Sequence, residues 1–112
     1  MKTEMLIGGK FVQGAGEALP VLNPATGATL ATIAEASAQQ VDAAVAAATK
    51  AFDRWSQTTP AERSTLLLRL AQRIEDTAAE LARLESLNCG KPLARVTQDE
   101  MPAVADVFRF FA

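Results

Sequence analysis

The chain has 112 residues, 49% of them hydrophobic, and its 11 basic and 13 acidic residues leave a formal net charge of −2. This length allows at most one ordinary domain, and the scattered Lys and Arg residues form no basic stripe that would bind nucleic acid. No apolar run approaches the roughly 18 residues that span a membrane, and the N-terminal stretch MKTEMLIGGK, which contains Glu4, lacks the apolar core of a signal peptide.

The sequence contains no histidine and a single cysteine, Cys89. Without histidine the chain cannot form a Ser-His-Asp triad, a Cys-His pair or an ordinary zinc site. A single cysteine cannot form an internal disulfide, so we expect a reducing, cytoplasmic location. The chain therefore has few ways to perform chemistry alone, and we predict no catalytic residue in it.

Residues 1–36 are predicted to be β-rich. Two short apolar runs, Leu6-Ile7 and Phe11-Val12, flank Gly8-Gly9-Lys10 and indicate a β-hairpin, because a type I′ turn needs positive φ at both central residues. Residues 13–19 are predicted to form a loop, and Val21-Leu22 a short extended segment. The alternation in residues 29–34 predicts a further strand, and together these strands suggest one small, mostly antiparallel sheet.

The turn between the last two strands has the sequence Asn23-Pro24-Ala25-Thr26-Gly27. The Asn side chain can accept a bond from the backbone two residues on, Pro fixes φ, and Gly supplies a positive φ at the exit.

Residues 37–112 are predicted to be helical. Capping boxes starting at Ser37, Thr59 and Thr77 predict three helix starts, and Pro60 suits a first helical position. Apolar residues follow the first two boxes at helical spacing and are expected to face a core. They are Val41, Val45, Ala48, Phe52 and Trp55 after the first box, and Leu66, Leu67, Leu70 and Ile74 after the second.

The third helix is predicted to stop at Gly90, because Gly takes the left-handed turn and Pro92 cannot continue the helix. A further helix is predicted to run to about Gln98, with Asp99 as a cap and a break or kink at Pro102. Val104, Val107, Phe108 and Phe111 continue an apolar face to the last residue, a pattern that suggests truncation. The expected fold class is α/β or α+β, with a small β-element followed by four to five helices.

Two motifs carry a resemblance to a known family. The helix end LARLESLNCGKPL (residues 81–93) stands some sixty residues after NPATG, and together they resemble the N-terminal part of an NAD(P)-dependent aldehyde dehydrogenase. The closing AVADVFRFFA is similar to the aminoaldehyde and betaine-aldehyde branch, most closely the γ-aminobutyraldehyde (1-pyrroline) dehydrogenases. The resemblance covers the whole chain, but family members are several times longer.

The resemblance implies oxidation of an aldehyde, such as 4-aminobutanal, to the acid with NAD or NADP. It implies a cysteine nucleophile, a glutamate that activates water, and a cofactor site, all in segments absent from these 112 residues. The catalytic domain and most of the cofactor domain would be absent as well. It further implies a homo-oligomer, a tetramer, in the full-length protein, and an inactive isolated chain.

Three features with a tempting functional reading are interpreted as structural. Cys89 sits at a helix C-terminus, where the negative end of the dipole disfavours a thiolate, so a small buried or half-buried side chain is expected. Gly90-Lys91-Pro92 is no phosphate loop, because it ends a helix instead of opening one. Gly14-Ala15-Gly16 is half of a dinucleotide fingerprint without the strand and helix that should flank it, so no cofactor-binding residue is predicted.

The resemblance suggests a monovalent-cation site at Leu22 and Asn88. Several family members hold such an ion partly through carbonyls at these two positions. Oxygen ligands suit a hard cation, although Asn88 replaces an Asp that is common in the family and so removes a charge. Alternatively, Asn88 simply bonds the helix end.

An acidic cluster on the last helix contains Asp99, Glu100 and Asp106. In the aminoaldehyde branch an acidic residue matching Glu100 lies at the entrance of the substrate tunnel, where it would attract the ammonium group of the substrate, with Asp106 adding longer-range attraction. The alternative is a solvated helix surface. A competing hypothesis for the whole chain is a free-standing helical interaction module, or an inactive remnant, without chemistry.

Overall fold

A computed structural model describes residues 2–112. The chain divides into two compact units. The first contains the strands and the first helix, up to residue 57. The second contains residues 58–112 together with the turn Asn23–Gly27. This composition confirms an α/β chain with small strands followed by helices.

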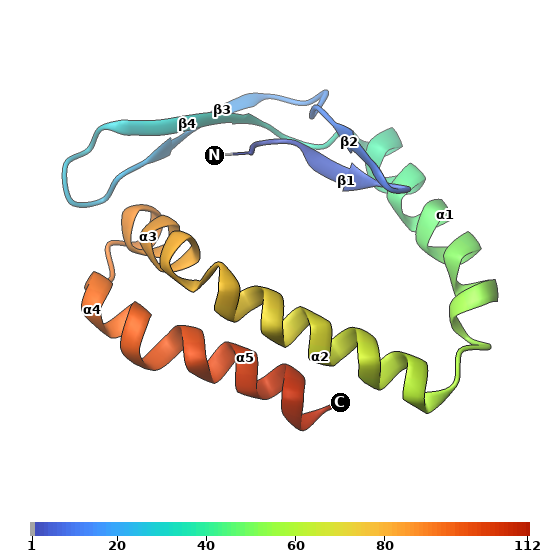
Figure 1. Ribbon diagram of the computed structural model, residues 1–112. Coiled ribbons are helices and arrows are strands. Elements are labelled where there is room, and N and C mark those ends of the chain that lie inside the picture. Colours follow the sequence, from blue (N-terminus) through green and yellow to red (C-terminus); the bar gives the residue numbers. More distant parts are fainter. Residues whose placement is uncertain (1) are drawn as a thin grey trace. The chain divides into compact units, whose positions relative to one another are not determined.

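The first unit contains two separate hairpins (Figure 1). Strands β1 (Met5–Ile7) and β2 (Lys10–Val12) pair across Gly8 and Gly9, whose φ angles of 58° and 80° confirm the predicted turn. Strands β3 (Ala18–Leu22) and β4 (Thr29–Ala34) form the other antiparallel pair. The prediction of a single sheet was therefore wrong. Residues 21–22 are extended as predicted, but β3 begins at Ala18, so the loop predicted for residues 13–19 ends before that residue.

Helix α1 (Ala38–Trp55) begins as the sequence predicts. The Ser37 hydroxyl accepts the amide of Gln40 at 3.3 Å, and Gln40 Oε1 accepts the amide of Ser37 at 3.0 Å. Gln40 also binds the preceding loop: its Oε1 accepts from the Ala15 amide at 2.9 Å and its Nε2 donates to the Gln13 carbonyl at 2.7 Å. One side chain thus caps the helix and anchors residues 13–15 to it.

The apolar stripe of α1 does not pack in a core, contrary to the prediction. Its large members stay exposed, Phe52 at 63% and Val45 at 61%, and no residue of α1 is buried. The hairpin approaches α1 at its alanines instead, since a Cβ on Gly8 would lie 3.7 Å from the Ala47 Cβ. Strands of three residues cover only a narrow strip of a helix, so the larger side chains have no cover within this unit.

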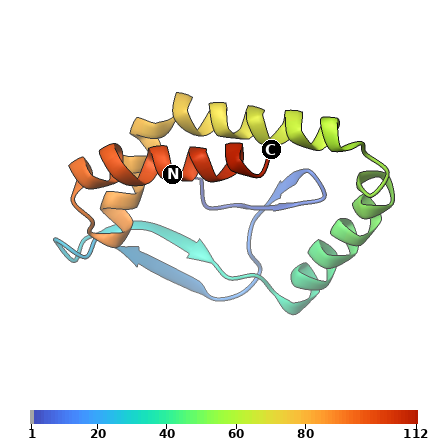
Figure 2. The same cartoon turned by 90° about the horizontal axis from the view of Figure 1, so that it is seen from below.

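The second unit is built from α2 (Pro60–Asp76), α3 (Ala78–Cys89) and a helical segment that contains α4 (Leu93–Arg95), the π turn η1 (Val96–Glu100) and α5 (Met101–Phe110). Helices α2 and α5 lie side by side in both views (Figures 1 and 2). Among the described residues the fully buried hydrophobics are Ala71, Ala82, Val96 and Ala105, all in this unit. Small residues at these positions allow the helix axes to approach closely.

The leucines of α2 correct the predicted buried face. Leu67 and Ile74 are half-buried, whereas Leu66 and Leu70 are more than 40% exposed. The buried position between them is Ala71, whose small side chain gave no signal in the apolar pattern. A period of 3.6 residues defines a face but does not give its width, and here a single neighbouring helix covers only part of the leucine face.

Two of the predicted caps on the second unit differ in kind. The Thr59 box is present, with the Glu62 amide donating to the Thr59 hydroxyl at 3.3 Å and Glu62 accepting the Thr59 amide at 2.7 Å. The Thr77 box is wrong: its hydroxyl donates back to the Arg73 carbonyl at 2.8 Å and caps nothing in α3. Only Thr77 separates α2 from α3, so Thr77 also marks the end of α2. The Arg73 carbonyl, in the last turn of α2, therefore accepts the hydrogen bond from the Thr77 hydroxyl.

The predicted cap at Asp99 is wrong, and of the predicted break or kink at Pro102 the structure excludes the break. Asp99 lies inside η1, and the helical backbone runs from Leu93 through Phe110. The Met101 amide donates to the Val96 carbonyl, one residue further back than in an α-helix. A widened turn just before Pro102 accommodates a ring that would otherwise clash with the preceding turn. The proline therefore reshapes the helix without ending it.

Candidate functional site

The two motifs behind the family resemblance meet in the second unit. In the NPATG turn, Asn23 Oδ1 accepts the Ala25 amide at 2.9 Å, the Gly27 amide donates to the Asn23 carbonyl at 2.8 Å, and Gly27 has a φ of 71°. Gly90 ends α3 with a φ of 72°, and a Cβ there would stand 2.9 Å from Pro24 Cγ. Both predicted turns are confirmed, and Gly90 is also required for close approach to Pro24.

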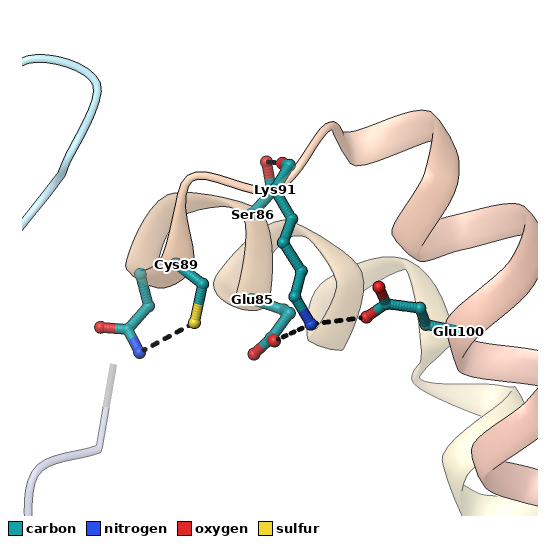
Figure 3. Close-up of polar contacts among 6 residues, drawn as sticks. Glu85, Ser86, Cys89, Lys91 and Glu100 are labelled. Atoms are coloured by element: carbon teal, nitrogen blue, oxygen red, sulfur yellow. Dashed lines mark hydrogen bonds and ion pairs between the residues drawn. The ribbon is translucent and has the colours of Figure 1, made fainter.

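Lys91 lies at the centre of the polar contacts after this turn (Figure 3). Its Nζ is 2.9 Å from Glu85 Oε1 on α3 and 2.8 Å from Glu100 Oε2 on η1. Its carbonyl accepts the Ser86 hydroxyl at 2.7 Å. Both the main chain and the side chain of Lys91 are thus held by α3, and the ammonium continues to the π turn.

The charges in this cluster stabilise one another. The hydrogen bonds that the Lys91 ammonium donates, first to Glu100 and then to Glu85, raise the pKa of Lys91 above its ordinary value. The Lys91 hydrogen bond and charge lower the pKa of the Glu85 carboxyl, to which the Cys89 thiol adds a smaller contribution. The side chains of all three are between a third and a half exposed, so water screens these interactions. One cation between two carboxylates leaves a formal charge of −1.

The predicted acidic residues therefore have different surroundings. Glu100 is half-buried and bound to Lys91, a partner that the sequence pattern did not reveal because the two residues are nine positions apart across a turn. Asp106 is exposed and forms a 3.4 Å ion pair with Arg109, which also pairs with Glu75 on α2. The Arg109 hydrogen bond lowers the pKa of Glu75. Among the described ion pairs, Glu100 and Asp106 have different cationic partners, Lys91 and Arg109.

Cys89 is exposed, which corrects the expectation of a buried or half-buried side chain. The thiol accepts a hydrogen bond from Asn88 Nδ2 at 3.8 Å. Cys89 is the last residue of α3. No histidine exists to act as a base, so nothing in these contacts indicates a nucleophile.

The predicted cation ligands lie in different units. Leu22 ends β3, where the ladder shifts register so that Leu30 is left between the partners of Val21 and Leu22. Asn88 occupies the last turn of α3. The residues described here contain no group of three or more His, Cys, Asp or Glu side chains that could hold a metal ion. A site formed by backbone carbonyls at Leu22 and Asn88 remains a prediction.

The glycine-rich loop at residues 14–16 packs against residues 34–35 and the start of α1. Its amides are already bonded, Ala15 to Gln40 and Gly16 to the Glu35 carbonyl at 2.8 Å. A Cβ on Gly14 would stand 2.0 Å from the Ala34 carbonyl oxygen, so backbone fills the space that a side chain at this position would need. The glycines serve close packing of this loop against residues 34–35.

Across residues 2–112, the helices are too short or too polar to cross a bilayer.

Comparison with known proteins identifies relatives along nearly the whole chain. DhaS of Bacillus subtilis (strain 168) is 45% identical over 97% of the chain and 23% of its own length. "Aldehyde dehydrogenase family 2 member B4, mitochondrial" of Arabidopsis thaliana is 42% identical over 98% of the chain and 21% of its own length. The crystal structure of PnpE from Pseudomonas sp. WBC-3 matches with a TM-score of 0.93 and 44% identity, over 98% of the chain and 23% of PnpE.

The chain thus spans between a fifth and a quarter of the length of these relatives. It resembles their N-terminal region in structure. The sequence model that describes the aldehyde dehydrogenase family matches residues 11–112 of the chain. This match includes the NPATG turn, the GKP turn and the whole helical unit, and on this ground the chain belongs to the aldehyde dehydrogenase family.

Proposed function

We propose that this chain is the N-terminal framework of an oxidoreductase that converts an aldehyde to the acid with NAD or NADP. The family match over residues 11–112 carries the proposal. A crystal structure of PnpE in complex with nicotinamide adenine dinucleotide also matches the chain, with a TM-score of 0.94 and 44% identity, and this supports the choice of cofactor. The residues of this chain supply turns and helix packing, and no chemical step is assigned to them.

The finer part of the proposal is an aminoaldehyde substrate, such as 4-aminobutanal, with Glu100 as the carboxylate that attracts its ammonium group. The Lys91 ion pair reduces the charge available at Glu100, but the cluster with Glu85 retains a formal charge of −1. Attraction of an ammonium to such a cluster is a charge-assisted interaction that strengthens where water is excluded. Asp106, which is balanced by Arg109, would contribute less.

Substitution of Glu100 tests the finer proposal in the product of the complete source gene. Glu100→Gln should raise KM for 4-aminobutanal roughly tenfold, the equivalent of about 1.4 kcal/mol, and leave an uncharged aldehyde of the same length nearly unaffected. Asp106→Asn provides a matched control on the same helix, with an expected change below about twofold. An equal loss on both substrates, or no loss on either, would assign Glu100 to the solvated surface.

The coarser proposal has its own test. The same gene product should reduce NAD+ or NADP+ in the presence of an aldehyde, and comparison of the two nucleotides identifies the cofactor. Absence of reduction with any aldehyde, from a folded protein, would favour the interaction-module alternative. We include in the proposal a homo-tetrameric assembly and a cytoplasmic location, which sedimentation and cell fractionation would check.

A further inference from the structure

Within the helical segment of residues 93–110, the π turn η1 is the one departure from α-helical geometry. Pro102 explains why a widened turn forms near this point, because an α-helical turn would place the ring against the preceding carbonyl. It does not explain how the turn is held against α3. A π turn is rare and is normally a single-turn insertion in an α-helix, so its alternative is an α-helical turn with a shifted register.

The Lys91–Glu100 contact depends on that register. A residue in an α-helix follows its neighbour by about 100° of rotation, so moving the extra residue out of η1 would rotate Glu100 away from α3. The 2.8 Å contact between Lys91 Nζ and Glu100 Oε2 would then be lost. If Glu100 kept its position and the turn changed register, Val96, which is fully buried at the start of the turn, would have to leave the core. The ion pair and the buried side chain thus favour the same register from opposite ends of the turn.

Lys91 is itself fixed on the α3 side. Its Nζ binds Glu85 at 2.9 Å, its carbonyl accepts the Ser86 hydroxyl, and the neighbouring Gly90 amide donates to the Ser86 carbonyl at 3.0 Å. The ammonium therefore reaches Glu100 from a position anchored to the last turn of α3 (Figure 3). Without it, Glu85 and Glu100 would face each other as two carboxylates with no cation between them.

From these contacts we propose that Lys91 is a positioning residue that latches η1 in its π register and fixes the direction of the Glu100 carboxylate. The latch works because an interaction made in only one of two conformations shifts the equilibrium toward it. This positioning role does not depend on the reaction that the protein performs. A negative result for the proposed function would therefore not contradict it. The device joins the GKP turn to the last helix, two segments that the sequence places on either side of α4.

Amide hydrogen exchange of the product of the complete source gene, read at the Met101 amide, tests the latch. Lys91→Met should raise the exchange rate at Met101 roughly three- to tenfold, a range that follows from the modest strength of partly exposed ion pairs. Lys91→Arg keeps the charge and should restore most of the protection. Glu100→Gln removes only one carboxylate and should raise exchange at Met101 as well, without leaving an uncompensated pair of charges.

Glu75→Gln is the matched control, because it removes an ion pair of similar exposure between α2 and Arg109 on α5 without touching η1. It should leave exchange at Met101 unchanged. Equal effects of Glu75→Gln and Lys91→Met, or equal loss of protection in α2 and at Met101, would overturn the proposal. So would an unsubstituted protein whose Met101 amide exchanges as fast as an unstructured peptide, because no latched turn would then exist.

Discussion

Two glycines with the same backbone conformation have different surroundings. Gly90 and Gly27 have φ angles of 72° and 71°, which cost any other L-residue about 1–2 kcal/mol. Beyond that cost, a Cβ at Gly90 would meet Pro24 at 2.9 Å, whereas a Cβ at Gly27 would have no atom within 4 Å. The GKP glycine therefore has both a conformational and a packing role, and the NPATG glycine only the first.

Alanine at these two positions should separate the two roles. We expect Gly27→Ala to lower the free energy of unfolding by about 1–2 kcal/mol, and Gly90→Ala to lower it further because Pro24 must move. Urea unfolding of the two variants, followed by circular dichroism, measures the difference. Equal losses would mean that the Pro24 contact relaxes freely.

The helix starts differ in how their hydroxyl side chains are used. Ser37 accepts the Gln40 amide, whereas Thr77 donates backward to Arg73 and leaves the first amides of α3 without a side-chain cap. Ser37→Ala should therefore destabilise the protein by about 0.5–2 kcal/mol. Thr77→Ala should cost clearly less, and chemical denaturation of both variants checks the order. The reverse order would show that Thr77 caps α3 in solution.

The ion pairs of Lys91 with Glu85 on α3 and Glu100 on η1 predict that the stability of the protein depends on pH. The pKa of Glu85 is depressed from its ordinary 4.5 by Lys91, so its stabilising effect is complete above about 4.5 and disappears as the pH falls through the lower folded-state value. The raised pKa of Lys91 keeps the cation present throughout this range. Lys91→Met should therefore destabilise the protein at pH 7 and make little difference near pH 2.

Thermal unfolding of both proteins between pH 7 and pH 2 measures this difference in Tm. A gap that stays constant over the whole range would show that Lys91 acts through the packing of its methylene groups and not through its charge.

Local signals in the sequence predicted local structure well. The Gly8-Gly9 turn, the NPATG turn, the Gly90 stop and the boxes at Ser37 and Thr59 all depend on residues a few positions apart, and all are confirmed. Features set by tertiary neighbours were not predictable in this way. Three features depend on segments that are distant in sequence or on an adjacent helix end. They are the side of α1 that is covered, the direction in which the Thr77 hydroxyl bonds, and the cation that pairs with Glu100.

At the scale of the molecule, few hydrophobic side chains are buried and many large ones are exposed. The fully buried side chains among the described residues are three alanines and one valine, whereas Phe110 and Phe111 are 82% and 73% exposed. These two rings contact each other edge to face at 5.1 Å but have little other cover. Exposed apolar surface of this kind promotes association or binding to a partner.

We expect the isolated chain to associate with rising concentration, to bind hydrophobic dyes and to unfold with low cooperativity. Size-exclusion chromatography over a hundredfold concentration range, dye fluorescence and thermal unfolding measure these three properties. A sharp monomer peak, a cooperative transition and no dye binding together would contradict this expectation.

We predict that these 112 residues, which belong to the aldehyde dehydrogenase family, form a framework without a reaction centre of their own. Incubation of the purified chain with NAD+ or NADP+ and a panel of charged and uncharged aldehydes, monitored by the absorbance of the reduced nucleotide, tests this most directly. We predict no turnover above the protein-free control. Turnover that scales with protein concentration and is abolished by Cys89→Ala would contradict the account, because it would place a nucleophile at the exposed end of α3.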